Sequence, residues 1–109
     1  MALRRRKLRL WRVKMTSIHD QIANKLANKF GTEYKSDKGI DLVLPNRVIE
    51  VETQKAGILQ GIKQVERSDK ARYLAVNKIN VENAISATQG TGVGVMNQTG
   101  RIIKKASRK

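Results

Sequence analysis

The segment that most constrains the fold is residues 39–53, Gly-Ile-Asp-Leu-Val-Leu-Pro-Asn-Arg-Val-Ile-Glu-Val-Glu-Thr. Two runs rich in β-branched residues flank Pro45-Asn46, a pattern typical of a β-hairpin. Proline disfavours the tight primed turns because it cannot adopt a positive φ. A four-residue loop with the same centre keeps the same strand register. The segment therefore predicts a hairpin centred between Pro45 and Asn46.

This register gives one face of the hairpin only apolar residues. Leu42 lies opposite Ile49, and Ile40 lies opposite Val51. A slip of one residue would place Asp41 beside Val51 and bury a carboxylate in the apolar face. The hydrophobic pattern therefore favours this register.

The other face collects three acidic residues. Val43 pairs with Val48, Asp41 lies opposite Glu50, and Glu52 follows two residues along on the same side. Three carboxylates this close repel one another unless a positive charge lies among them, and oxygen ligands suit Mg²⁺ or Mn²⁺. The alternative is an ordinary solvated strand face that carries acidic residues. The pattern thus predicts a divalent-metal site, with the solvated face as its competitor.

Hydrophobic periodicity places the remaining elements. Ile18, Ile22, Leu26 and Phe30 recur every four positions after a capping Thr16 or Ser17. We expect this helix to end at Gly31. The other predicted elements are a strand at 32–35, a helix at 57–69, a strand at 72–77, a helix at 81–88, and strands at 93–96 and 101–104. The predicted order αβββαβαββ indicates an α/β (α+β) fold with a mixed sheet flanked by helices.

Charge points to a polyanionic partner. The chain has 109 residues, with 23 Lys and Arg against 9 Asp and Glu, and a net charge of +14. That field favours nucleic acid first and acidic membrane surfaces second. Seven of the basic residues lie in the first fourteen positions: Arg4, Arg5, Arg6, Lys7, Arg9, Arg12 and Lys14. We interpret 1–14 as a disordered, nucleic-acid-binding arm; a transit peptide and a dispensable extension before Met15 are the alternatives.

The length fits one domain, which we place at 15–109. There is no cysteine, so disulfides and cysteine-based zinc sites are excluded. No apolar run approaches the roughly 20 residues of a membrane span, and the N-terminus lacks the apolar stretch of a secretory signal. We therefore expect an intracellular, cytoplasmic protein without a membrane partner.

The hairpin resembles the PD-(D/E)XK signature of restriction-endonuclease-like nucleases, which has Asp on one strand and Glu-x-Lys on the next. Asp41 and Val48-Ile-Glu-Val-Glu-Thr53 carry the resemblance. The order of helices and strands is also similar over roughly residues 16–104. In outline the chain is nearest to small archaeal Holliday-junction resolvases and to viral or mobile-element nucleases. The resemblance implies that Asp41, Glu50 and the Val51 carbonyl bind Mg²⁺ or Mn²⁺.

One departure from the signature affects catalysis. Glu52 stands where the family has Lys, which orients the attacking water and stabilises negative charge on the phosphate. Some restriction enzymes of this superfamily use Glu there, as a metal ligand or general base. Alternatively, Lys55 or Lys63 supplies the missing cation, or activity has been lost.

Accessory residues follow from the same resemblance. Asp20 lies where archaeal resolvases carry a metal-binding Glu on the first helix, although it also suits a helix cap. Gln60 and Gln64 lie where RecB-like members carry a Gln that points toward the site. His19 is the only histidine, and we expect it to be exposed.

The sequence therefore predicts a metal-dependent DNA endonuclease that acts as a homodimer, with Asp41, Glu50 and Glu52 as its catalytic residues. One alternative is a nucleic-acid-binding protein on the same fold without catalysis. A second is a ribosome-associated RNA-binding protein, which charge alone suggests and which leaves the three acids unexplained.

Overall fold

The computed structural model of the protein describes residues 17–35 and 39–107. Within them the order is a helix, two strands, a helix, a strand, a helix and two strands, with a short 3₁₀ turn before each of the last two helices. The elements are α2 (Ile18–Phe30), β1 (Leu42–Val43), β2 (Arg47–Glu52), η1 (Lys55–Gly57), α3 (Ile58–Val65), β3 (Ala71–Val76), η2 (Lys78–Asn80), α4 (Val81–Ala87), β4 (Gly94–Asn97) and β5 (Ile102–Lys104).

The five strands form one mixed sheet in the order β1-β2-β3-β4-β5. The three central strands are parallel, and the two outer strands run antiparallel to their neighbours. Because α3 and α4 connect the parallel strands, the carboxyl ends of β2, β3 and β4 meet at one edge of the sheet. The predicted mixed sheet flanked by helices is confirmed.

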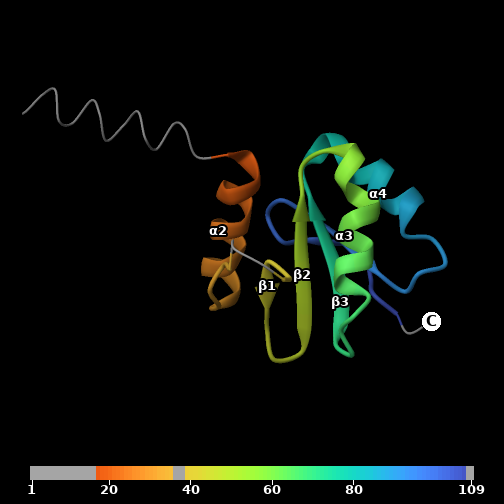
Figure 1. Ribbon diagram of the computed structural model, residues 1–109. Coiled ribbons are helices and arrows are strands. Elements are labelled where there is room, and N and C mark those ends of the chain that lie inside the picture. Colours follow the sequence, from red (N-terminus) through yellow and green to blue (C-terminus); the bar gives the residue numbers. More distant parts are fainter. Residues whose placement is uncertain (1–16, 36–38, 108–109) are drawn as a thin grey trace, which may run out of the picture.

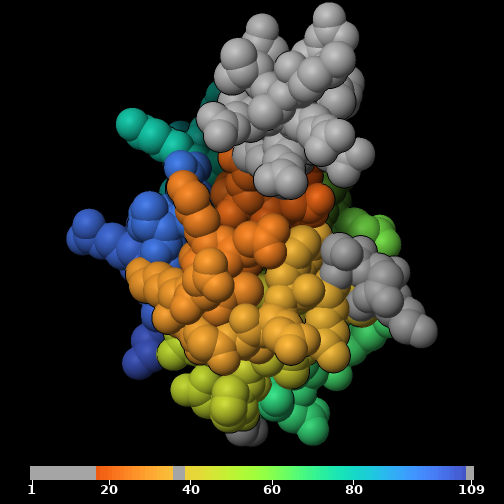
Figure 2. All heavy atoms as spheres, turned by 90° about the vertical axis from the view of Figure 1, so that its left-hand side faces the viewer, coloured from red at the N-terminus to blue at the C-terminus, as the bar shows by residue number. Residues whose placement is uncertain are grey.

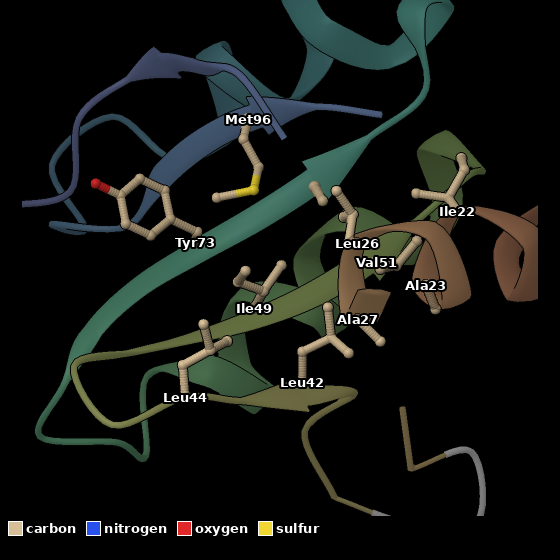
Figure 3. Close-up of a cluster of buried hydrophobic side chains, with 11 residues drawn as sticks. Ile22, Ala23, Leu26, Ala27, Leu42, Leu44, Ile49, Val51, Tyr73 and Met96 are labelled. Atoms are coloured by element: carbon tan, nitrogen blue, oxygen red, sulfur yellow. The ribbon is translucent and has the colours of Figure 1, made fainter. Parts of the chain in front are cut away.

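Helices cover both faces of the sheet, α2 on one and α3 with α4 on the other (Figure 1). The apolar side chains of α2 meet those of β1 to β4 in a cluster that we call the α2-side core (Figure 3). Its buried members are Ile22, Ala23, Leu26, Ala27, Leu42, Leu44, Ile49, Val51, Tyr73, Ala75 and Met96. The α3-side core comprises Val48, Ile58, Ile62, Val65, Leu74, Val76, Ala84, Val93 and Val95.

α2 has the predicted ends. The Ser17 hydroxyl accepts a hydrogen bond from the Asp20 N–H at 3.1 Å, as an N-cap does. At the other end Gly31 takes the left-handed conformation, with φ 70°, and donates its N–H to the Ala27 carbonyl. No helix in the described ranges is long and apolar enough to cross a bilayer.

The register of the hairpin is the predicted one, with Leu42 opposite Ile49 and Val43 opposite Val48. Ile40, however, does not share the face of Leu42, as the sequence predicted. β1 begins only at Leu42, and Ile40 packs against the α3-side core. The chain therefore joins the sheet only at Leu42, and neither Ile40 nor Asp41 belongs to β1.

The predicted strand at 32–35 is wrong, because this segment forms no ladder with the sheet. It is tied to the hairpin by two hydrogen bonds, from Thr32 Oγ1 to the Val43 carbonyl and from the Lys35 N–H to the Asp41 carbonyl, both 3.1 Å long. Only Tyr34 packs against the α2-side core. With a single inward side chain, the segment lacks the apolar alternation that stabilises a strand.

Candidate metal-dependent active site

Asp41 immediately precedes β1. Its carboxylate accepts a hydrogen bond that the backbone of a longer β1 would accept. Continuing the ladder would place the Ile40 carbonyl opposite the Val51 N–H. Instead Asp41 Oδ2 accepts that N–H at 2.9 Å. The N–H and C=O of one strand residue point to the same side, so the Val51 carbonyl also faces this edge. Asp41 and the Val51 carbonyl, both predicted metal ligands, are therefore neighbours.

Glu50 meets Asp41 through the backbone. Its Oε1 accepts the Asp41 N–H at 3.0 Å. Burial raises the pKa of Glu50 to about 7, and the charge of Asp41 adds to the effect, while the hydrogen bond from Asp41 opposes it. Burial also raises the pKa of Asp41, against the hydrogen bond from Val51 and the charge of His19. The two carboxyl groups thus share a poorly hydrated place, where negative charge is costly.

Glu52 rests against two glycines of the following helical segment. A Cβ at Gly57 would clash with Glu52 Oε1, and a Cβ at Gly61 would lie 2.9 Å from both Cγ and Oε2. We call these two positions the glycine cradle. Burial raises the pKa of Glu52 to about 7, and no side chain or N–H of the described residues donates a hydrogen bond to its carboxylate. Glu52 is therefore a half-buried carboxylate that accepts no hydrogen bond there, and only the charge of His19 opposes the rise of its pKa.

The acids are not all on one face. Glu52 lies on the α3 side of the sheet, whereas Asp41 reaches the Val51 backbone and contacts α2. Asp41 lies beside Glu50, as the register predicts, but its carboxylate turns toward the Val51 N–H and His19 and away from the side of Glu52. Asp41 and Glu50 thus meet at the edge of β2 beside the start of β1, and Glu52 lies against Gly57 and Gly61.

His19 also belongs to this group, although its sequence position alone did not indicate it. Its Nε2 lies 3.2 Å from Asp41 Oδ2, and its side chain is only 30% exposed, so the prediction of an exposed histidine is wrong. Burial opposes protonation of the ring, but the hydrogen bond to Asp20 and the charges of Asp41, Asp20 and Glu52 outweigh it, and the pKa of His19 is raised. His19 precedes buried Ile22 and Ala23 by three and four residues, so helical periodicity could have revealed its inward orientation.

Asp20 lies further out, in contact with His19 and not with Asp41. Its Oδ1 accepts a hydrogen bond from the Tyr34 hydroxyl at 2.7 Å and lies 3.2 Å from His19 Nδ1. The hydrogen bonds from Tyr34 and His19 lower the pKa of Asp20 below its ordinary value. The structure therefore places Asp20 against Tyr34 and His19, and these two side chains separate it from the position of a metal ligand beside Asp41.

The other predicted accessory residues lie on the outer surface of the helical segment. Lys55 borders a groove between α3 and α4, together with Leu59 and Asn83. Lys63 and Gln60 are exposed and Gln64 is half-buried. The ion pairs found in residues 17–35 and 39–107 involve His19, so neither lysine pairs with Glu52 there. The basic positions of the predicted arm, residues 1–14, lie outside the described residues.

The donor chemistry of this edge suits a hard divalent cation. Asp41, Glu50 and the Val51 carbonyl offer oxygen ligands of the kind that Mg²⁺ and Mn²⁺ prefer. In the described ranges of the chain, no group of three or more His, Asp or Glu side chains is placed to hold a metal ion. Both hydrogen-bonding contacts of the Asp41 carboxylate end on Oδ2. Its Oδ1 is therefore the oxygen left for a ligand.

In comparisons with known proteins, no family model, no curated protein and no solved structure matches the chain.

Proposed function

We propose that the protein is a Mg²⁺- or Mn²⁺-dependent nuclease that hydrolyses phosphodiester bonds in DNA. The observation that carries the proposal is the pair of half-buried glutamates, Glu50 and Glu52, whose pKa values burial raises to about 7 beside Asp41. Holding several such carboxyls together costs stability unless a cation offsets their charge. A metal-dependent activity would explain why these carboxyl groups are kept despite that cost.

The proposed ligands are Asp41, Glu50 and the Val51 carbonyl. When bound there, a divalent ion supplies a Lewis acid that polarises a phosphoryl oxygen and lowers the pKa of a bound water. Asp41 is preorganised as a metal ligand, since the Val51 N–H and His19 hold its Oδ2. Glu50 is held by one hydrogen bond, from the Asp41 N–H.

Glu52 is the proposed general base. A carboxyl group whose pKa lies near neutrality can take a proton from the attacking water and return it to the leaving oxygen. Its position against the glycine cradle keeps it half-buried at the end of β2. This role accounts for a Glu where the family that the hairpin resembles has Lys.

The proposed substrate follows from charge. At +14 the chain attracts a polyanion, and contacts from Lys and Arg to the phosphate backbone weaken steeply as salt rises. The proposed site is single, and a single site cuts one strand at a time. We therefore propose that double-strand cleavage requires a homodimer.

Cleavage of supercoiled plasmid and of a four-way junction, each with Mg²⁺ or Mn²⁺, tests the proposal. The variants are Asp41→Asn, Glu50→Gln and Glu52→Gln, which remove charge while keeping size and an acceptor oxygen. Asp41→Asn is preferable to Asp41→Ala because Val51 keeps an acceptor for its buried N–H. Glu66→Gln, at the exposed C-cap of α3, is the matched control that removes a negative charge elsewhere.

We expect metal-dependent nicking by the wild type and by Glu66→Gln, and its loss in the three site variants. Equal cleavage by the site variants would contradict the site assignment. Binding of DNA without cleavage under any metal would favour the alternative function, a non-catalytic nucleic-acid-binding protein, which the absence of a lysine at position 52 also suggests.

A further inference from the structure

A chain of contacts runs from the segment after α2, through the first turn of α2, to Asp41. The Tyr34 hydroxyl donates to Asp20 Oδ1 at 2.7 Å and lies 3.3 Å from His19 Nδ1. Asp20 Oδ1 lies 3.2 Å from the same Nδ1, and His19 Nε2 lies 3.2 Å from Asp41 Oδ2. Four polar side chains from three separate places in the sequence thus form one connected series.

The two nitrogens of His19 have separate partners. Nδ1 faces Asp20 and Tyr34, and Nε2 faces Asp41. A ring contacted at both nitrogens has one orientation in which all these contacts are made. The Tyr34 ring lies beside it, with centroids 6.0 Å apart and planes inclined by 51°.

From this geometry we infer that Asp20 and Tyr34 are positioning residues, which act through His19 to fix the orientation of the Asp41 carboxylate. The inference rests on the proposed function only for what Asp41 then does. Partners of this outer kind orient the groups that contact a metal, and their loss typically costs about 10- to 100-fold in metal affinity or activity.

The positions of these residues in the fold support the inference. α2 is anchored by its cap at Ser17, so its first turn is fixed where His19 and Asp20 emerge. Tyr34 belongs to the segment held to the hairpin by Thr32 and Lys35. Figure 2 looks onto this side of the molecule, where the orange surface of α2 adjoins the yellow-orange surface of the segment that follows it.

The hydroxyl of Tyr34 can be tested apart from its ring. The ring packs against the α2-side core, whereas the hydroxyl reaches Asp20 and His19. Tyr34→Phe removes only the hydroxyl and keeps the packing. Tyr73→Phe is the matched control, because the Tyr73 hydroxyl accepts from the Ala106 N–H at 3.2 Å and lies outside this series.

The first measurement is an NMR experiment on the His19 ring in the metal-free protein. His19 is the only histidine, so its ring protons are unambiguous in an NMR spectrum. We expect through-space cross-peaks between the ring and Asp41 in the wild type and in Tyr73→Phe, and their loss or marked weakening in Tyr34→Phe. Cross-peaks of unchanged strength in Tyr34→Phe would overturn the inference.

The second measurement is a double-mutant cycle on Mn²⁺ affinity, with Tyr34→Phe, His19→Ala and the two combined. If Tyr34 acts through His19, Tyr34→Phe weakens Mn²⁺ binding by about tenfold in the wild type and has no further effect once His19 is alanine. Independent, additive losses would overturn the inference. A wild type that binds no Mn²⁺ would contradict the proposed function, and the ring measurement would then decide the inference.

Discussion

Alanine at Gly61 tests the glycine cradle that holds Glu52. In the middle of a helix, Gly→Ala ordinarily stabilises by about 1 kcal/mol. Here the new Cβ would lie 2.9 Å from Glu52 Cγ and Oε2 and 3.1 Å from Leu74 Cδ2. Forcing a methyl into such a contact costs about 1–3 kcal/mol. We expect the clash to outweigh the gain, with a net loss of about 1 kcal/mol in the free energy of unfolding.

The sign should reverse when Glu52 is removed. In a Glu52→Ala background only the contact with the end of Leu74 remains, so Gly61→Ala should be neutral or stabilising by up to about 1 kcal/mol. The coupling between the two positions is then on the order of 2 kcal/mol. Urea denaturation of the four proteins measures it, with exposed Gln60→Ala on the same helix as the additive control. Equal stabilisation by Gly61→Ala in both backgrounds would refute the cradle.

Three further outcomes concern stability. Glu50 and Glu52 bind protons more tightly in the folded chain, with pKa values of about 7 against 4.5, so the metal-free protein should lose thermal stability as pH rises from 4.5 to about 7. Glu50→Gln should flatten that slope, and a stability that rises over this range would contradict the assignment. Leu26→Ala should cost about 2–5 kcal/mol in urea unfolding, because the side chain is fully buried; a cost below this range would show that the α2-side core repacks. Asn80→Ala should cost about 1–3 kcal/mol, since the buried amide donates to the Thr53 carbonyl after β2; an unchanged midpoint would show that this hydrogen bond contributes nothing.

Local patterns predicted most of the fold because most of it depends on local rules. The cap at Ser17 and the stop at Gly31 follow from backbone hydrogen bonding within α2. The hairpin register follows from period-two alternation and the turn at Pro45-Asn46, since a slip of one residue would turn Leu42 or Ile49 to the wrong face. These features depend on neighbours in the sequence.

The features that were not predicted depend on tertiary contacts. At the start of β1 the Asp41 carboxylate, and not the Ile40 carbonyl, accepts the Val51 N–H, and no propensity encodes this choice. Helical periodicity could indicate that His19 faces inward, but its contact with Asp41 depends on how α2 packs against the sheet. The glycine cradle likewise appears only when α3 lies against Glu52, because Gly57 and Gly61 in isolation indicate only a weak helix.

Asp41 has two roles, as acceptor for the Val51 N–H and as proposed metal ligand, and this affects how related sequences should be interpreted. Its carboxylate takes the place of a strand partner for a buried backbone N–H, so a descendant that had lost catalysis would still be selected to keep it. Glu52 accepts no hydrogen bond from the described residues, and its burial is unfavourable to folding. Among homologues, retention of Asp41 would therefore report on folding, whereas retention of Glu52 would report on the proposed activity.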